Sequence, residues 1–448
     1  MKFLRIIFLF FIFKNSILNA GTIDAKEYQF FLHDPALFTK TVYQLNEVVM
    51  ANNFSPMVAS RNYVYAAVAA YEIIAAQFPK KYKSLSGQLH GLNQLPAVNL
   101  KEPVDFELAA LLAYIKVGEA VTFPEGSMKD YKKNLLIKSR EKGLPAEVEK
   151  ASQQFADSIS LAIIAWSKKD NYLQTRTALK YEITDEQGRW VPTPPGYFEA
   201  AEPHWGEIRT LVIDSASAFN VPPPFSFNVN DSNSSYYKEV LKIKNTVEHL
   251  TPEQKHIAMF WDDNPFKLNV QGHFSYSTKK FSPPGHWMSI CGIAAAKANA
   301  DYATTVYATA LTSIALFDAF IECFYIKYKY NCIRPETVIN KYFSQQWKPY
   351  LQTPAFPEYT CGHSTISASA AEALTAAFGN DFSYTDSTEL EFGIESRNFK
   401  SFRQAADENN WARFYGGIHF HNSCIVSTEI GRQIGETVVK SLKMKIRD

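Results

Sequence analysis

The chain has few cysteines, almost no net charge and few segments with the alternating pattern of a β-strand. No two cysteines are spaced as CxxC, so a zinc site built on cysteine pairs is not predicted. The net charge of +1 gives no overall basic surface, so we expect no nucleic-acid partner. No repeat of fixed short period is present, which argues against a solenoid.

The cysteines number five, so at least one is unpaired if the chain is a monomer. All lie in the second half, most of them in segments that resemble buried helix. We expect most of them to serve as small buried apolar residues. They are Cys291, Cys323, Cys332, Cys361 and Cys424.

Long apolar runs are also scarce, and the one that stands out lies at the N-terminus. A basic start, Met1–Arg5, precedes the apolar run Ile6–Phe13, and the small residues Ala20 and Gly21 follow. This pattern is typical of a secretory signal peptide, assigned to residues 1–20, and the run is too short for a stable membrane span. We expect a secreted or periplasmic protein with no stable span after cleavage; an uncleaved N-terminal anchor is the alternative.

Apolar residues at helical spacing dominate the rest of the chain, of which 46% is hydrophobic. The pattern predicts an all-α fold of two packed helical bundles. The clearest helical segments are Tyr63–Phe78, Phe106–Thr122, Glu147–Ser167, Pro252–Trp261, Gly292–Cys323 and Ser364–Phe378.

A proline-rich segment, Gln174–Pro224, interrupts the helical pattern. Proline at this density excludes a long helix and predicts an ordered loop held by aromatic side chains. Polar Asn228–Ser235 follows and is typical of a surface link. We therefore divide the mature chain into an N-terminal helical domain with the proline-rich loop, 21–235, and a C-terminal helical domain, 236–448.

Lys327 and Arg334 form the first of three stretches with chemical potential. Seven residues separate them, nearly two helical turns, so they are expected on one face of a helix. Pro335 disfavours helix at Arg334, which places the arginine at the helix end, where its side chain can turn into a cavity. For this pair alone, a solvated basic face is an equal alternative.

The second stretch is Thr360–Thr365, which contains Cys361, Gly362 and His363. Gly362 permits close approach of the backbone, and Ser364 or Thr365 is expected to cap the following alanine-rich helix. Backbone amides at such a helix start favour an anion, and an imidazole beside it can act as acid or base. A histidine that only helps to cap the helix is the alternative.

The third stretch contains Arg413 and His419. Gly416 and Gly417 break the helix between them, so the two side chains can converge from a helix end and the next helix start. His421 offers a second imidazole nearby, but no third ligand spacing supports a metal site from this pair.

Together the three stretches bring three positive charges, a helix start and two imidazoles to one predicted pocket. Lys327, Arg334, Cys361, Gly362, His363, Arg413 and His419 form this set. Such a pocket suits a tetrahedral or trigonal-bipyramidal oxyanion such as phosphate or vanadate.

In order and approximate separation, these stretches resemble the vanadium-dependent haloperoxidases and the related type 2 phosphatidic acid phosphatase superfamily. The likeness extends to Pro284–Trp287, Phe356–Tyr359, Gly416–Phe420 and the Trp190–Trp205 loop, which resemble bacterial secreted vanadium haloperoxidases. Among those enzymes the chain looks most like the marine bacterial iodoperoxidase type. The likeness covers nearly the whole mature chain and implies a vanadate cofactor, with hydrogen peroxide, a halide and an unidentified organic acceptor as reactants.

The resemblance also implies a role for each residue. His419 would be the protein ligand to vanadium and, with His363 as acid–base partner, a catalytic residue. Lys327, Arg334, Cys361, Gly362 and Arg413 would bind the cofactor's oxygens. Phe324 and Phe356 are candidates for the halide pocket.

The sequence departs from the family at a few positions. Cys361 stands where Ser is common, and a thiol is the weaker hydrogen-bond donor. Thr360 replaces a proline, and Phe324 replaces a tryptophan with its indole donor. Ser423 stands where many of the phosphatases have an acidic residue four positions after the last histidine, which disfavours phosphoryl transfer through a charged histidine–acid pair.

Three functions therefore remain open at this stage. The first is a secreted haloperoxidase that oxidises a halide, iodide before the others, with hydrogen peroxide. The second is a vanadate-inhibitable acid phosphatase with His419 as nucleophile. The third is a non-catalytic helical protein that binds an oxyanion.

Overall fold

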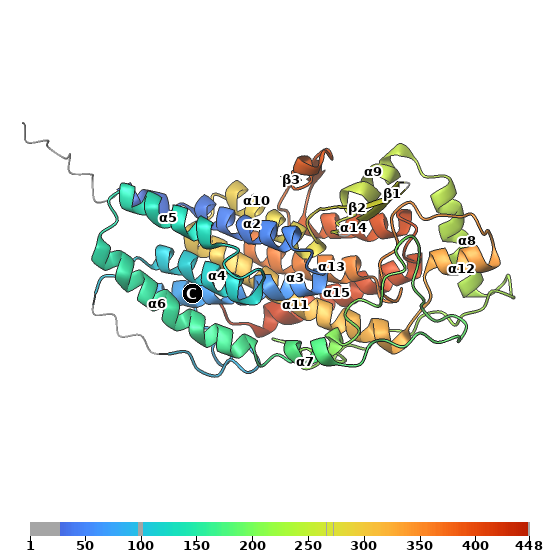
Figure 1. The fold of residues 1–448 in the computed structure, drawn as a ribbon, viewed down its shortest axis with the longest axis horizontal. Coiled ribbons are helices and arrows are strands. Elements are labelled where there is room, and N and C mark those ends of the chain that lie inside the picture. Colours follow the sequence, from blue (N-terminus) through green and yellow to red (C-terminus); the bar gives the residue numbers. More distant parts are fainter. Residues whose placement is uncertain (1–26, 97–101, 266, 272, 447–448) are drawn as a thin grey trace, which may run out of the picture.

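The regular secondary structure of the described residues is almost entirely helical, as the sequence predicts. The computed structural model describes residues 27–96, 102–265, 267–271 and 273–446, and the predicted signal peptide lies outside these ranges. Within them, two short hairpins are the only sheets. Helices of the first half gather at one end of an elongated molecule, and helices of the second half extend from among them to the other end (Figure 1).

The first half packs around α3, which is buried along nearly all its length. Ser55 starts this helix by accepting a hydrogen bond from the Val58 amide, and Pro56 occupies the first turn. The helices of this half are α1 (Glu27–Leu32), α2 (Pro35–Ala51), α3 (Pro56–Gln77), α4 (Phe106–Val121), α5 (Lys129–Glu141), α6 (Ala146–Ser167) and α7 (Tyr172–Thr177).

The proline-rich segment is an ordered loop with one short turn, η1 (Trp205–Glu207). The indoles of Trp190 and Trp205 are fully buried. The Asp318 carboxylate, on a central helix of the second half, accepts hydrogen bonds of 2.7–3.0 Å from three consecutive loop amides, residues 211–213. Buried indoles and this carboxylate therefore fix the loop against the second half.

The second half packs around α11, α13 and α15. Its helices are α8 (Ser235–Glu248), α9 (Pro252–Phe260), α10 (Pro283–Lys297), α11 (Tyr302–Tyr330), α12 (Pro335–Tyr342), α13 (Gly362–Phe378), α14 (Phe402–Tyr415) and α15 (His421–Ser441), with the turn η2 (Leu390–Phe392). The antiparallel hairpins pair β1 (Lys267–Gln271) with β2 (Phe274–Thr278) and β3 (Tyr384–Asp386) with β4 (Arg397–Phe399).

Helices α13 and α15 lie unusually close together. A Cβ atom added at Gly431 would lie 2.1 Å from the Thr365 carbonyl oxygen, and one at Gly435 would lie 2.7 Å from that of Ser369. Only glycine permits this approach of the two backbones. The contact fixes the register between the helices that begin at the two predicted histidine motifs.

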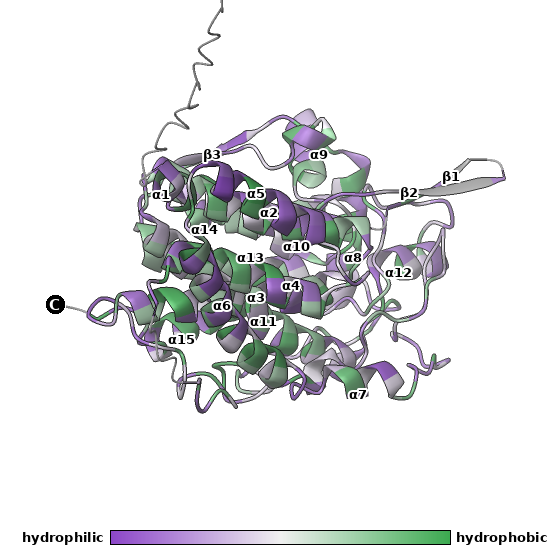
Figure 2. Cartoon of the chain, turned by 60° about the vertical axis from the view of Figure 1, so that its left-hand side comes forward, coloured by the Kyte–Doolittle hydropathy of each residue, from purple (hydrophilic) through white to green (hydrophobic). Residues whose placement is uncertain are grey.

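One apolar core runs through both halves, joining side chains of α2, α3 and α4 to those of α10, α11, α13 and α15. Helix α11 is long and apolar enough to cross a bilayer by composition, which the sequence analysis had not expected outside the N-terminus. In the fold, 94% of its most apolar window is buried inside the protein, as in the core helix of a globular domain. Hydrophilic residues instead mark outer helices such as α5 (Figure 2).

The predicted helix Gly292–Cys323 is in fact two helices. Helix α10 ends at Lys297, Asn299 takes a left-handed φ of 47°, and Asp301 caps α11 with a 2.7 Å hydrogen bond from the Thr304 amide. The alanine-rich sequence hides this break because neither glycine nor proline marks it.

Candidate active site

His419 lies in the short link between α14 and α15. Helix α14 ends at Tyr415, and Gly417 takes a φ of 77°, a conformation that favours glycine. The Ile418 amide then donates back to the Arg413 carbonyl. This turn brings His419 beneath the end of α14, so the glycine pair breaks the helix as the sequence predicts.

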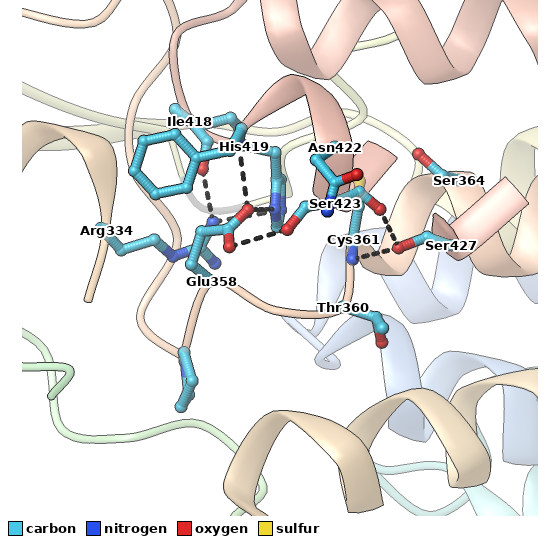
Figure 3. A network of polar contacts seen from close by, with 12 residues as sticks. Arg334, Glu358, Thr360, Cys361, Ser364, Ile418, His419, Asn422, Ser423 and Ser427 are labelled. Atoms are coloured by element: carbon cyan, nitrogen blue, oxygen red, sulfur yellow. Dashed lines mark hydrogen bonds and ion pairs between the residues drawn. The ribbon is translucent and has the colours of Figure 1, made fainter. Parts of the chain in front are cut away.

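Arg334 and Glu358 hold the His419 ring from its two nitrogens (Figure 3). Nδ1 lies 2.9 Å from Glu358 Oε1, and Nε2 lies 3.1 Å from Arg334 Nη1. A guanidinium can only donate, so Nε2 accepts and Nδ1 carries the proton. The ring therefore presents an unprotonated Nε2, the form that a metal ligand or a nucleophile requires.

Glu358 is a functional residue whose role the sequence motifs do not indicate. Its carboxylate also accepts hydrogen bonds from the Phe420 amide at 3.1 Å and from Ser423 Oγ at 2.9 Å. The acidic partner missing four residues after His419 thus comes from 61 residues earlier, and Ser423 supports it. An acidic residue in the segment just before Cys361 was the available signal.

Lys327 and Arg334 reach the site from two elements, not from one continuous helix. Helix α11 stops at Tyr330, Asn331 takes a left-handed φ of 50°, and Arg334 precedes the first turn of α12. The predicted placement of Arg334 at the end of the same helix is therefore wrong, because Asn331 ends α11 first. The two side chains nevertheless converge, and both are fully buried.

The Lys327 ammonium is directed at the loop that carries Glu358. It donates to the carbonyls of Pro357 at 2.9 Å and Glu358 at 3.1 Å, and also to that of Thr360. With three donors on three carbonyls, Lys327 fixes this loop and contributes positive charge to the site.

Arg334 keeps one donor free. Its Nε donates to the Phe356 carbonyl and its Nη1 to the Ile418 carbonyl, both at 2.8 Å, whereas the buried Nη2 has no partner. The guanidinium is therefore fixed in orientation, with its remaining amino group available to an acceptor.

Helix α13 begins at Gly362 after Cys361, which provides no side-chain cap. Ser364 Oγ instead contacts Asn410 Oδ1 at 2.9 Å, and Thr365 Oγ1 donates back to the Cys361 carbonyl at 3.0 Å. The predicted hydroxyl cap is therefore wrong, because the helix starts earlier. The first-turn amides of a 17-residue helix thus meet no capping side chain, which leaves the helix start attractive to an anion.

The turn at Trp261 and Asp262 holds Arg413 and His363 together. Arg413 Nη1 donates to the carbonyls of Trp261 at 3.0 Å and Asp262 at 3.1 Å, while its Nε has no partner. The His363 ring also bonds the Asp262 carbonyl, and its Nε2 is buried without a partner. Because Nε2 is the free nitrogen, Nδ1 makes that bond and carries the proton of the neutral ring.

A narrow cavity connects these groups. Its lining consists of Gly362, His363, Arg413, His419, Phe324, Phe356, Pro56, Met57, Pro283, Phe320 and Pro354. Lys327, Arg334 and Cys361 are not part of the lining. Lys327 and Arg334 lie behind the lining residues: Arg334 contacts His419, and the Lys327 ammonium lies 4.9 Å from the centre of the Phe356 ring.

A wider pocket of about 470 Å³ lies outside this cavity and shares Phe356, His363 and Arg413 with it. Pro56 and Met57 at the start of α3 line both spaces, so the N-terminal half forms part of the entrance.

The electrostatics of the site favour an anion. Burial lowers the pKa of Lys327 to about 8 and that of Arg334 to about 10. Within the described ranges, neither residue forms an ion pair with a carboxylate, and the nearest one to Arg413 is Asp262 at 4.0 Å. Positive charge and unpartnered buried nitrogens therefore meet at one place, as a bound oxyanion requires.

His421, the weaker candidate for a metal ligand, lies apart from this site. Its ring packs against Trp411 and Phe414, with ring centres 5.0 and 5.3 Å apart. Its half-buried position on aromatic side chains gives it a packing role.

Comparison with known proteins adds family evidence to this geometry. Residues 307–448 match the protein family described as the VCPO second helical-bundle domain. Among curated proteins, no sequence matches the chain. Among solved structures, the chain is similar to a bacterial vanadium-dependent iodoperoxidase with a TM-score of 0.86 and 41% sequence identity, covering 92% of this chain and 97% of that one.

Two structures of bacterial vanadium-dependent chloroperoxidase share the fold. The holo form gives a TM-score of 0.62 at 16% identity and covers 87% of this chain and 93% of that one. The apo form gives 0.61 at 17% identity and covers 87% and 95%. With the higher identity to the iodoperoxidase over nearly the full length of both chains, the chain belongs to the vanadium-dependent haloperoxidase family.

Proposed function

We propose that the protein is a vanadium-dependent haloperoxidase that uses hydrogen peroxide to oxidise a halide, with iodide the most readily oxidised. The observation that carries this proposal is the set of three buried cations around His419. The Nδ1–H group of His419 donates to Glu358, which leaves Nε2 of the same ring unprotonated. The family membership supports the same reading.

Vanadate fits the groups that the site provides. His419 Nε2 would be its protein ligand, Arg413 Nε and the start of α13, which line the cavity, would meet its oxygens, and Arg334 would contribute positive charge from just behind them. Lys327 would also contribute positive charge from behind the residues that line the cavity. When bound, vanadate supplies a Lewis acid that activates hydrogen peroxide toward the halide.

His363 is suited to take the proton that hydrogen peroxide loses on binding. Burial, with the nearby Arg413 charge, holds the pKa of His363 well below its usual range, so the ring is neutral. Its unpartnered Nε2 lies in the cavity and can accept a proton there. The same nitrogen can return the proton to the leaving oxygen when the halide is oxidised.

The halide would meet the aromatic part of the cavity. Phe324 and Phe356 both line it, with ring centres 5.3 Å apart. The guanidinium carbon of Arg334 lies 5.0 Å from the centre of the Phe356 ring, so positive charge stands behind an apolar wall. Such a wall favours a large, weakly hydrated anion, which among the halides is iodide.

Phosphoryl transfer is the second candidate, and Glu358 is the observation that favours it. A histidine nucleophile paired with a carboxylate suits attack on phosphorus, and the sequence had suggested that this carboxylate was absent. A silent oxyanion-binding protein would share the same cations but show no turnover.

Reconstitution with vanadate separates the three functions. The protein is assayed in parallel with iodide, bromide and chloride in the presence of peroxide, and with a phosphate ester without vanadate. We expect peroxide- and vanadate-dependent iodide oxidation to dominate. Turnover of the ester without halide oxidation would support the phosphatase, and no turnover of either kind would leave only the binding protein.

We also propose that the mature protein is secreted or periplasmic, which rests on the N-terminal sequence of residues 1–20. N-terminal sequencing of the natural protein is expected to begin after Ala20. A first residue of Met1 in a membrane fraction would favour the uncleaved anchor.

The oxidised halide would leave through the wider pocket and react with organic acceptors in solution.

A further inference from the structure

Two cysteine thiols meet directly behind the proposed vanadate site. Cys361 precedes the first residue of α13, and Cys424 lies in the first turn of α15. Both are buried in the same small apolar cluster, and each thiol perturbs the pKa of the other. All five cysteines are free in the structure, so this is a dithiol.

The packing of α13 on α15 explains why the two thiols lie together. The Cys361 amide donates to Ser427 Oγ at 2.7 Å (Figure 3), and Ser427 stands one turn after Cys424 on the same face of α15. Farther along, Gly431 keeps the two helices in tight contact. The helices therefore hold both cysteines on facing sides of a rigid interface.

Peroxide is delivered close to this dithiol. The Cys361 thiol and the His419 ring interact electrostatically, and the next residues, Gly362 and His363, line the cavity. An oxidant that enters the cavity to react beside His419 therefore arrives one residue away from the thiol. Cys291 and Cys332 lie elsewhere, against Thr309 and the Tyr330 carbonyl, whereas Cys323 accepts a hydrogen bond from Thr360, the residue before Cys361, and is the one competing partner.

We propose that Cys361 and Cys424 form a reversible disulfide when peroxide accumulates without halide, and that this bond switches the vanadate site off. The inference rests on the proposed function only for the source of the oxidant, which is hydrogen peroxide. It depends on the presence of cysteine at both positions of this chain.

The chemistry needs no reactant beyond peroxide. The Cys361 sulfur attacks one peroxide oxygen, the O–O bond breaks, and the thiol proton leaves with the other oxygen as water, giving a sulfenic acid. The Cys424 sulfur then attacks the Cys361 sulfur, its proton and the hydroxyl leave as a second water, and the S–S bond forms. Two thiols are oxidised and one peroxide is reduced to two waters.

The disulfide would change the site through Cys361. The thiol would no longer be available to His419 or to an oxyanion, and the start of α13 would be tied to α15. Because Cys361 directly precedes the helix start that faces the anion, this constraint would move the Gly362 amide relative to His419. We expect vanadate to be held at least roughly tenfold more weakly, as for other changes beside a metal ligand.

The test uses the full-length protein without vanadate or halide. It is treated with increasing hydrogen peroxide, free thiols are alkylated, and peptides are identified by mass spectrometry. We expect a Cys361–Cys424 linked peptide, with two hydrogens fewer than its parts. After desalting, vanadate binding is measured by equilibrium dialysis, and dithiothreitol is expected to restore it.

Matched variants separate this pair from general oxidation. Cys424→Ser cannot form the bond, so peroxide should not produce a dithiothreitol-reversible loss of vanadate binding. Cys332→Ser removes a more exposed thiol outside the site and should behave as the unmodified chain. Circular dichroism checks that each variant is folded, and Cys424→Ala replaces Cys424→Ser if the hydroxyl is not tolerated.

Three results would overturn the proposal: no linked peptide, a Cys323–Cys361 link in its place, or a Cys361–Cys424 link that leaves vanadate binding unchanged. The linkage is measured without halide turnover. A chain that forms the bond but oxidises no halide would therefore refute the proposed function and leave the dithiol switch intact.

Discussion

At the scale of single residues, His419 and His363 have separable tasks. His419 offers an unprotonated Nε2 as the proposed metal ligand, whereas His363 lies across the cavity with its own Nε2 free. We expect His419→Ala to abolish tight vanadate retention. His363→Ala should reduce turnover far more than vanadate binding, because it removes a proton acceptor and no ligand.

Vanadium content after dialysis and the rate of iodide oxidation, measured on the same preparations, distinguish the two variants. Equal vanadium content in His419→Ala and the unmodified chain would refute the assignment of His419 as ligand.

Glu358 is expected to act through His419. In Glu358→Gln the amide oxygen can still accept from Nδ1, but the negative charge that raises the basicity of the ring is lost. We expect vanadate affinity to fall by about 10–100-fold. Ser423→Ala is the matched control, because it removes one donor to Glu358 and leaves the bond to His419 in place.

Equilibrium dialysis with vanadate measures Glu358→Gln and Ser423→Ala without relying on turnover. An affinity in Glu358→Gln equal to that of Ser423→Ala would show that the carboxylate charge has no role.

Cys361 and Phe324 set the expectation for halide choice. A thiol is a poorer hydrogen-bond donor than the hydroxyl common in the family, and Phe324 offers no donor. Both changes should make the bound peroxide less electrophilic, so iodide oxidation should exceed bromide oxidation and chloride oxidation should be negligible. Cys361→Ser should strengthen the hydrogen bond and raise the bromide-to-iodide rate ratio. Chloride turnover that rivals iodide turnover in the unmodified chain would contradict this reasoning.

At the scale of elements, the close contact of α13 and α15 should be intolerant of any side chain at its centre. In Gly431→Ala the new Cβ would lie 2.1 Å from a backbone carbonyl oxygen, which cannot move without separating the helices. We expect a loss of about 3 kcal/mol in the free energy of unfolding, together with weaker vanadate binding.

Gly118→Ala is the matched control for this contact, because it is also a helical glycine but meets the flexible end of Leu45, at 3.1 Å. Its stability should change by less than about 1 kcal/mol. Urea unfolding of both variants measures their free energies of unfolding. Equal losses of stability would show that the α13–α15 contact is no more sensitive to an added methyl group than the contact at Gly118.

The secondary-structure elements also show how much of the fold and of the site the sequence predicts. The helical segments and the break at Gly416 and Gly417 follow from local patterns, because spacing and glycine act within a few residues. The end of α11 at Asn331 and the pairing of Glu358 with His419 do not. The pairing of Glu358 with His419 depends on a contact between segments far apart in the chain, which a single sequence does not display, and a single asparagine is a weak stop signal within a helical pattern.

At the scale of the whole molecule, the two predicted domains share one apolar core. Side chains of α3 in the first half and of α11 in the second lie in the same cluster, and α3 contributes Pro56 and Met57 to the site. The boundary near Ser235, where α8 begins, remains a prediction. Because the core is shared, the free energy of unfolding is a property of both halves together. The pH dependence of this free energy can be tested on the intact chain.

Glu322, on α11, should make the molecule less stable as pH rises. Both of its carboxyl oxygens are buried without partners, and burial raises its pKa from 4.5 to about 8. Between these values the folded chain keeps a proton that the unfolded chain has lost. The unfolded state therefore binds fewer protons, and the free energy of unfolding falls as pH rises through this window.

Glu322→Gln removes this titration while keeping the shape of the side chain. Relative to the variant, the unmodified chain should lose on the order of 3 kcal/mol in its free energy of unfolding between pH 4.5 and 8. Urea unfolding of both chains across this range measures the difference, which should be small at the acidic end and largest near pH 8. Burial raises the pKa of Glu72 as well, to about 7, but that titration is common to both chains and cancels. A constant difference across the range would mean that Glu322 is ionised in the folded protein.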